Sequence, residues 1–410
     1  MDRLDLLYDE SEALDPQVRL RRQLERLRAV LVATTAPAAR EAAARAKLLE
    51  GPLTLERLRQ LPLLRKEQLP QIQAQQPPFG GWATWERVRK IFASPGPIYE
   101  PEGPGPDYWG TAPALHAAGF RAGDVVLNCF SYHLGPAGSI LEGGLLHLGA
   151  IVVPGGVGNT ELQVRTAAYL GATGYVGTPS FLATLLERAD ELGLPLRFQV
   201  AAVSAEPLPE DLRARFEARG IRTRQFYATG DVGAIAYECP QADGMHLLDR
   251  CIVELVDPAT GAPVPTGAPG EVVVTLLDPT YPLLRLGTGD LSILTEEPCP
   301  CGRTSPRLVR ILGRVGEAVK VRGIFVHPAQ LREAMARVPH LPRYRFIVRR
   351  HDHQDVLIAQ VEAAADPDLA ERVRQAVRDL TRLRADVEFV PRGTLPQEGP
   401  VLVDERTWDS

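Results

Sequence analysis

Short apolar runs alternate with helical stretches between residues 124 and 203, and this alternation constrains the fold more than any other feature. The predicted strands are 124–128, 149–154, 172–176 and 199–203, and the predicted helices are 138–148, 161–170 and 180–192. Such alternation is typical of a parallel sheet flanked by helices, with strands such as 149–154 buried. Because ligands of open α/β sheets bind at loops that leave the strand carboxyl ends, we expect the chemistry there.

The regions on either side have different patterns. Residues 1–90 are predicted to be helical, with an amphipathic surface helix over 19–32, and the Pro/Gly-dense stretch 94–106 is predicted to lack regular structure. After Gly233 the chain becomes rich in strands, and from about Arg314 strands and helices alternate again. The elements expected in these two parts are 252–256, 271–276, 318–321, 328–335, 344–349, 356–361 and 369–380.

These patterns predict an α/β chain in three parts. Residues 1–90 form a helical region, residues 91–313 form a large core domain with parallel sheets and a β-rich subdomain, and residues 314–410 form a small α+β domain. A length of 410 residues is ample for such an arrangement, since domains usually contain 50–250 residues.

Charge and composition exclude several classes of protein. A net charge of −5 gives no electrostatic footprint for nucleic acid. No apolar stretch is long enough for a membrane span, and the N-terminus does not resemble a signal peptide. Five cysteines in 410 residues are too few for a disulfide scaffold. We therefore expect a cytoplasmic protein that binds neither nucleic acid nor a membrane.

Three of the five cysteines gather with a histidine around the β-rich segment. They are Cys239, Cys299 and Cys301, and the histidine is His246. Three thiolates and one imidazole form a complete tetrahedral ligand set for zinc, with no position left open for catalysis. A disulfide between Cys299 and Cys301 would be strained, and two unpaired surface thiols are the plainer alternative. We predict a structural zinc site.

Lysine is scarce, because only four of the 46 basic residues are lysines: Lys47, Lys66, Lys90 and Lys320. Any chemistry that requires a primary amine therefore has four candidates.

Six segments, in order along the chain, resemble the adenylate-forming enzymes, and specifically their phenylacetate–CoA ligase branch. They are 154–161, 177–180, 204–208, 227–233, 282–290 and 313–323. The resemblance covers roughly residues 90–400, and any one of these motifs alone would be weak. It implies a two-step reaction in which a carboxylate attacks the α-phosphate of ATP and CoA then displaces AMP. It also implies rotation of the small domain about a hinge at 313–323.

The resemblance assigns roles to individual residues. Asp231 takes the place of the magnesium-binding glutamate, Asp290 would hold the ribose hydroxyls, and Lys320 would supply catalytic charge. The residues implied on the nucleotide side are Ser204, Ala205, Glu206, Tyr227, Ala228, Thr229, Asp290 and Arg314. Those implied in the acyl pocket are Phe130, Tyr132, His133, Gly155, Thr178 and Pro179. ATP or AMP, magnesium and CoA are the implied cofactors. Taken singly, Tyr227 could be a packing residue and Arg314 an exposed ion-pair partner.

The phosphate-binding and activating parts of the motif set depart from the family. The loop that reads Ser-Ser-Gly-Thr-Thr-Gly-Lys-Pro in the family aligns with residues 94–101, where Glu100 replaces the lysine and two prolines remove amide donors. Pro400 aligns with the C-terminal catalytic lysine, and Gly287 replaces a basic residue of the ribose segment. A carboxylate facing a polyphosphate is repulsive, and more so in a desolvated site.

Two functions remain open from the sequence. The first is AMP-forming activation of an aromatic or hydrophobic carboxylic acid with transfer to CoA. A homodimer is compatible with this function. The second is a catalytically impaired paralogue that binds AMP, an acyl-adenylate or CoA as a sensor or partner subunit. A protein that runs only the thioester-forming or reverse step on a ready-made adenylate would lie between the two.

Overall fold

A computed structural model describes residues 7–94, 97–317, 319–321, 324–326, 328–351, 354–381 and 383–406. The chain divides into two compact units, and each is described by itself. The first contains residues up to Thr288 together with Ile293–Arg310, and the second contains Gly289–Ser292 and the chain from Ile311 onward.

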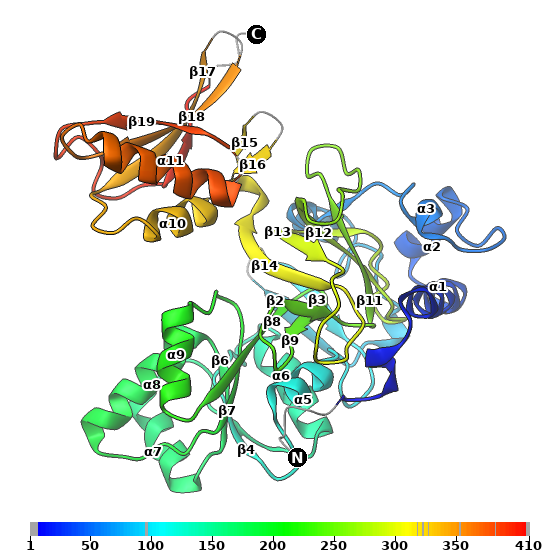
Figure 1. The fold of residues 1–410 in the computed structure, drawn as a ribbon. Coiled ribbons are helices and arrows are strands. Elements are labelled where there is room, and N and C mark those ends of the chain that lie inside the picture. The colour runs from blue at the N-terminus through cyan, green and yellow to red at the C-terminus, as the bar shows by residue number, and fades with distance from the viewer. Residues whose placement is uncertain are drawn as a thin grey trace. The chain divides into compact units, whose positions relative to one another are not determined.

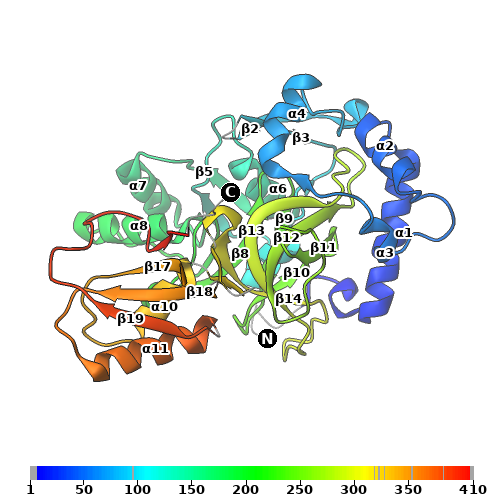
Figure 2. The same ribbon diagram turned by 90° about the horizontal axis from the view of Figure 1, so that it is seen from above.

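The alternation over residues 124–203 is confirmed as a parallel sheet covered on both faces. Its strands run parallel in the order β5-β4-β6-β7-β8. Helices α7, α8 and α9 cover one face and α5 and α6 the other (Figures 1 and 2). The bounds are α5 Ala112–Ala118, β4 Val125–Asn128, α6 Ala137–His147, β5 Ile151–Pro154, α7 Thr160–Leu170, β6 Gly174–Gly177, α8 Pro179–Leu192, β7 Val200–Val203, α9 Glu210–Ala218 and β8 Arg222–Thr229.

Burial of the 149–154 strand is the part of this prediction that is wrong. Strand β5 pairs only with β4, so it is the edge of the sheet. Ile151 at its start is 58% exposed, and Pro154 at its end is also exposed. An apolar run cannot by itself distinguish an edge strand from a central one, because both carry β-branched residues.

The β-rich region continues the same sheet beyond β8, where the pairing changes from parallel to antiparallel. The order from β8 outward is β9, β10, β14, β13, β12 and β11, and β1 pairs in parallel with β13. The bounds are β1 Leu64–Arg65, β9 Gly233–Glu238, β10 Met245–Leu247, β11 Cys251–Val256, β12 Pro269–Leu276, β13 Leu286–Thr295 and β14 Arg307–Arg314. The strands predicted at 252–256 and 271–276 are confirmed as β11 and β12.

The N-terminal region is largely helical, as predicted. The helix expected over 19–32 is α1, whose N-cap Asp15 accepts hydrogen bonds from the amides of Gln17 and Val18, and Leu27 and Leu31 form part of its buried face. The helices are α1 Pro16–Ala33, α2 Pro37–Arg45, α3 Leu55–Leu58 and α4 Leu69–Gln75, with short 3-10 turns at Glu10–Ala13, Lys66–Gln68 and Trp85–Arg87.

Residues 94–106 were expected to lack regular structure, and this is wrong for their first part. Strands β2 (Lys90–Ser94) and β3 (Ile98–Glu102) form an antiparallel hairpin. The amide and carbonyl of Tyr99 bond to the side chain of Gln73, so this side of β3 faces away from β2. Pro101 is two residues further and points its backbone the same way, so its missing N–H costs no bond between the strands.

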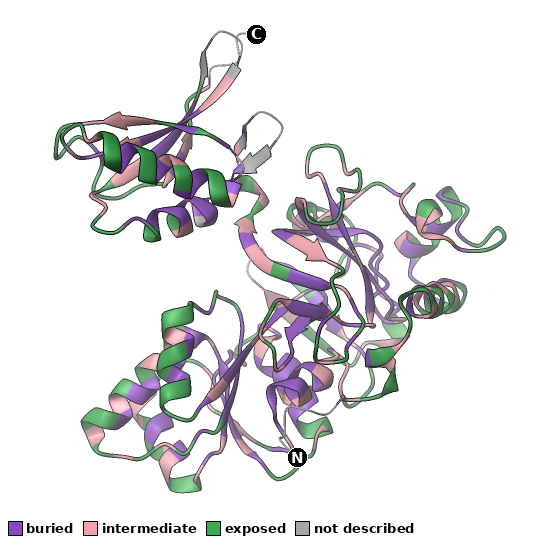
Figure 3. Cartoon of the chain, in the orientation of Figure 1, coloured by how far each residue is buried: buried purple, intermediate pink, exposed green. Residues whose placement is uncertain are grey.

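The second unit contains a four-stranded sheet in the order β19-β18-β17-β20, with a core shared with two helices. Figure 3 shows the buried side of α11 turned toward this sheet and its exposed side turned away. The bounds are β15 Val319–Val321, β16 Ile324–Val326, α10 Pro328–Ala336, β17 Tyr344–His351, β18 Gln354–Val361, α11 Pro367–Thr381, β19 Ala385–Phe389 and β20 Leu402–Asp404, after a 3-10 turn at Val315–Glu317. All five elements predicted in this part are present.

Within the described ranges, no helix has both the length and the apolar character needed to cross a membrane.

Candidate functional site

A cavity of about 850 Å³ opens at the carboxyl ends of the parallel strands, where the sheet topology predicts a ligand site. The loops after β4 and β7, the end of β8, the start of α6 and the β2–β3 hairpin form its wall. Apolar side chains dominate the lining, as in most small-molecule sites. The lining residues are Ala93, Ser94, Pro97, Phe130, Ser131, His133, Leu134, Gly135, Pro136, Ala137, Ile140, Leu141, Ser204, Ala205, Phe226, Ala228, Thr229 and Gly230.

Six of the residues expected in the acyl and nucleotide sites meet at this cavity. They are Phe130, His133, Ser204, Ala205, Ala228 and Thr229. The backbone of Ala205 has φ +72°, a left-handed conformation that costs free energy for a residue with a Cβ. The hydroxyl of Ser204 donates to the carbonyl of Phe226 at 2.7 Å and ties this bend to β8.

The other predicted pocket residues are not among the lining residues and make contacts within the fold instead. The Tyr132 hydroxyl accepts a 2.8 Å hydrogen bond from the Asn128 amide, and the carbonyl of Gly155 accepts one from Gln163. Thr178 is the N-cap of α8 and Pro179 its first residue.

Two predicted nucleotide-side residues also lie away from the cavity lining. Glu206 accepts a 2.6 Å hydrogen bond from the amide of Ser180, at the beginning of α8. Tyr227 is 8% exposed in the core of β8. Their roles toward a nucleotide remain predictions.

Beside the cavity, two buried carboxylates form a cluster with Lys66, a partly exposed lysine that the sequence did not single out. Nζ of Lys66 lies 2.5 Å from Oδ2 of Asp231, and Glu100 accepts a hydrogen bond from the Ser94 hydroxyl. Glu100 is 0% and Asp231 1% exposed. Ser94 and Gly230, the neighbours of this cluster, line the cavity. Lys66 therefore brings an ammonium group to the predicted magnesium ligand.

Glu100 is held in an unfavourable environment for a charge. Burial, together with the negative charge of Asp231, raises its pKa from 4.5 to about 7, although the hydrogen bond from Ser94 and the charge of Lys66 act in the opposite direction. The folded protein therefore retains this proton over a pH range in which the unfolded chain has lost it.

This shift predicts a pH-dependent stability difference for Glu100→Gln, which mimics the protonated acid. In the natural protein, the stabilisation that comes from protonated Glu100 is fully present below pH 4.5. It is lost as the pH rises through about 7. The variant should match it near pH 4.5 and exceed it above pH 7 by on the order of 3 kcal/mol, since each pKa unit corresponds to about 1.4 kcal/mol. Urea unfolding from pH 5 to 8, without added divalent cations, measures the difference. A stability difference between the variant and the natural protein that does not change with pH would contradict the raised pKa of Glu100.

A second cation from the N-terminal region, Arg65, lies beside Gly287. Arg65 pairs with Gly287 across β1 and β13, and its guanidinium forms an ion pair with the buried Glu271. A Cβ at position 287 would lie 2.5 Å from Oε1 of Glu271. The glycine therefore leaves room for this ion pair.

In the second unit, Arg314 and Asp290 are partners. Nη1 of Arg314 lies 2.9 Å from Oδ1 of Asp290, and the two side chains are 52% and 13% exposed. The backbone of Lys320 lies in β15 opposite Phe325, whereas its side chain lies outside the described part of the structure. Arg406, the first cation after Pro400, forms ion pairs with Asp355 and Asp404, and its side chain is 6% exposed. Its guanidinium therefore binds within the sheet of the second unit.

The predicted zinc ligands come together. The three sulfur atoms of Cys239, Cys299 and Cys301 and a ring nitrogen of His246 lie within 4.8 Å of one another. Nδ1 of His246 lies 3.0 Å from the Ser305 carbonyl, which directs Nε2 to Cys301 at 3.4 Å. Hydrogen bonds from Cys239 and His246 hold the pKa of the Cys301 thiol well below its usual value. A four-ligand set of this kind fits structural zinc.

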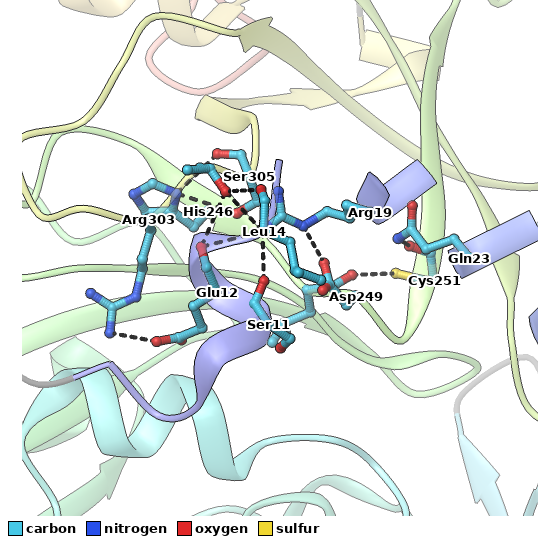
Figure 4. Close-up of polar contacts among 12 residues, drawn as sticks. Ser11, Glu12, Leu14, Arg19, Gln23, His246, Asp249, Cys251, Arg303 and Ser305 are labelled. Atoms are coloured by element: carbon cyan, nitrogen blue, oxygen red, sulfur yellow. Dashed lines mark hydrogen bonds and ion pairs between the residues drawn. The ribbon is translucent and has the colours of Figure 1, made fainter. Parts of the chain in front are cut away.

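The segment before α1 is fastened next to this cluster (Figure 4). Arg303 forms a 3.1 Å ion pair with Glu12, and the amide of Thr304 donates to the Glu12 carbonyl at 3.0 Å. Nε of Arg19 lies 2.7 Å from Asp249, as Figure 4 also shows. The loop that carries two cysteines therefore also holds the N-terminal segment.

Comparison with known proteins gives matches over both units. The family model of the AMP-binding enzyme matches residues 108–275, and that of the AMP-binding enzyme C-terminal domain matches residues 323–406. A phenylacetate–coenzyme A ligase of Thermus thermophilus is 32% identical over 70% of this chain and 71% of its own length. That of Escherichia coli is 30% identical over 78% of this chain and 79% of its own length.

Solved structures show the same arrangement of elements. An open conformation of 2-hydroxyisobutyryl-CoA ligase, in complex with 2-HIB-AMP and CoA, superposes with a TM-score of 0.84 at 25% identity. The match covers 96% of this chain and 93% of that one.

Proposed function

This chain belongs to the AMP-binding enzymes, the adenylate-forming superfamily that includes the phenylacetate–CoA ligases, and from this premise we propose that it is an AMP-forming acid–CoA ligase. The acid is aromatic or otherwise hydrophobic. In the first step the acid forms an acyl-adenylate with release of pyrophosphate, and in the second the thiol of CoA displaces AMP.

The observation that carries the proposal is the cavity at the strand carboxyl ends. Its apolar part, with Phe130, Ile140 and Phe226, suits a hydrophobic acyl group. Its other part contains Ser204, Ala205 and Thr229, which the resemblance assigns to the nucleotide. One cavity thus offers room for both halves of an acyl-adenylate.

Charge beside the cavity supports activation of the acid. Lys66 places an ammonium group beside Asp231, and Asp231 keeps Oδ1 without a hydrogen-bond partner among the described residues. A free, buried carboxylate oxygen fits magnesium, which takes oxygen ligands. When bound, magnesium would neutralise polyphosphate charge; the chain's own contribution is to position Asp231 and Lys66.

For the second unit we propose that Asp290 accepts the ribose hydroxyls and that Arg314 reaches a ribose or phosphate oxygen. Their mutual ion pair holds the carboxylate while leaving Arg314 half exposed. Lys320 stays the proposed catalytic lysine of this unit. The second cluster, of Cys239, His246, Cys299 and Cys301, we propose to bind structural zinc. None of the five cysteines is paired in a disulfide, which supports a reducing, cytoplasmic location.

ATP–pyrophosphate exchange with a panel of aryl and aliphatic acids, followed by CoA thioester formation, tests the proposal. Exchange and thioester with at least one hydrophobic acid are expected. AMP binding by calorimetry without exchange would overturn it in favour of the impaired paralogue. If the protein forms the thioester from a supplied acyl-adenylate but shows no exchange, it catalyses only the second step of the reaction.

Narrowing the apolar part of the cavity should change acid selectivity. Ala137 lines the cavity at the first turn of α6, so Ala137→Phe places a ring in the acyl space. We expect kcat/KM for bulky aryl acids to fall about 10–100-fold relative to small acids, because misfit of even small groups costs 1–3 kcal/mol. The KM for ATP is the internal control. An equal loss for small and bulky acids would place the acyl group elsewhere.

A further inference from the structure

We propose that Glu100 and Asp231 together hold a divalent cation, which takes over the electrostatic role of the loop lysine that this chain lacks. The inference rests on the proposed function, since it concerns how the same site accepts a polyphosphate. The family resemblance assigns a metal contact only to the position of Asp231, so Glu100 would be an additional ligand.

Each of the two carboxylates keeps one oxygen available for a ligand. Oε1 of Glu100 accepts the Ser94 hydroxyl and Oδ2 of Asp231 contacts Lys66. Oε2 of Glu100 and Oδ1 of Asp231 are buried and have no hydrogen-bond partner among the residues that the structure describes. Buried polar atoms are nearly always satisfied in native proteins, so two such oxygens in one cluster call for a ligand.

The cluster also lacks sufficient positive charge. When both carboxylates are ionised, they and the Lys66 ammonium sum to one negative charge, and Glu100 and Asp231 are almost fully buried. A buried charge without a counter-ion is costly. Exchanging lysine for glutamate lowers the charge of the site by two, and one divalent cation restores it.

The available atoms are of the kind that divalent cations prefer. Carboxylate oxygens are the preferred ligands of magnesium and manganese, and magnesium is commonly held by one or two carboxylates together with substrate phosphates. Glu100 lies on β3 and Asp231 directly after Gly230, and a Cβ at Gly230 would lie 3.1 Å from Oε1 of Glu100. The glycine therefore allows the Glu100 carboxylate to lie beside the turn that carries Asp231.

The test measures metal binding without nucleotide. Manganese is titrated at pH 7.5 into the full chain with its Cys/His cluster loaded with zinc, and free manganese is read by electron paramagnetic resonance. We expect the natural protein to bind one ion, Glu100→Gln to bind at least ten-fold more weakly, and Asp231→Asn likewise. Glu210→Gln, which removes an exposed carboxylate whose side chain is 87% exposed, is the matched control. Circular dichroism verifies that each variant is folded.

A second measurement separates a cation from a proton. Glu100→Gln retains the shape of a protonated Glu100. If protonation alone removes the repulsion between Glu100 and the polyphosphate, this variant should bind ATP at least as tightly as the natural protein binds it in the presence of magnesium. That result, or manganese binding unaffected by Glu100→Gln, would overturn the proposal. Glu100→Lys should bind ATP with a weaker dependence on magnesium. If no carboxylic acid supports ATP–pyrophosphate exchange but manganese binding requires Glu100, the ligase proposal fails while the metal site stands. If exchange occurs but manganese binding does not require Glu100, the ligase proposal stands and the metal site fails.

Discussion

Replacing Lys66 by methionine is expected to lower ATP–pyrophosphate exchange by at least about 100-fold, because removing one preorganised charge from such a site commonly costs 10²–10³ in rate. Lys66 is the ammonium group that lies against Asp231, at 2.5 Å. Without it, two buried carboxylates face an incoming polyphosphate with no lysine beside them. Initial rates of exchange at several ATP concentrations separate a loss in kcat from a rise in KM.

A loss of stability must be distinguished from a loss of chemistry in this variant. Breaking a buried ion pair by removing one partner typically costs 3–5 kcal/mol. The double variant Lys66→Met with Glu100→Gln removes one of the two negative charges, so its melting temperature should recover while exchange stays low. If the double variant recovers exchange as well as stability, Lys66 has only a structural role.

The hairpin lysine provides the matched control for this experiment. Lys90 pairs with Glu102 at 2.9 Å, but its side chain is 58% exposed. Exposed pairs contribute about 0–1 kcal/mol, so Lys90→Met should leave both exchange and melting temperature nearly unchanged.

Periodicity predicted the elements wherever one pattern covers a whole element. The strand at 124–128 and the helix at 180–192 have compact apolar patterns, and both are present as β4 and α8. It failed where the outcome depends on distant partners. Burial of β5 depends on whether another strand lies beyond it, and the β2–β3 hairpin depends on Gln73 of α4 binding the outer edge of β3. Neither dependence is visible in the local sequence.

The site shows the same division. Motif order predicted six residues that line the cavity, because loops at the carboxyl ends of neighbouring parallel strands necessarily meet. Lys66 was missed because it lies 165 positions before Asp231 and follows no strand of the parallel sheet. The scarcity of lysine was the available signal: of four amines, two belong to the short span that carries β1 and β2. At both departures from the family pattern, Glu100 and Gly287, a cation from a distant part of the chain lies nearby.

Removing two zinc ligands should destabilise the protein about as much as breaking the Lys66–Asp231 ion pair. We expect the purified protein to contain one zinc per chain, and Cys299→Ser with Cys301→Ser to lose it. Structural zinc contributes on the order of 10 kcal/mol in small domains. Because much of the core of this chain remains, we expect a loss of about 3–5 kcal/mol and a melting temperature lower by on the order of 10 °C. Elemental analysis and calorimetry give the two readouts.

The position of the cluster predicts what fails first. Cys239 and His246 flank the turn between β9 and β10, while Cys299 and Cys301 lie between β13 and β14, so the metal would join two loops of one sheet. Arg303 and Thr304 hold the Glu12 segment from the second loop. Loss of zinc should therefore release this segment, and limited proteolysis should cleave near residues 9–15 before it cleaves the parallel sheet.

A buried cysteine outside the cluster distinguishes metal loss from a general effect of replacing cysteine. Cys251 is 1% exposed and lies in β11, so Cys251→Ser should keep one zinc per chain and an intact N-terminal segment. A zinc-free natural protein whose melting temperature is insensitive to chelators would contradict the assignment. Equal early cleavage in both variants would show a general effect of replacing a buried cysteine, and not an effect of metal loss.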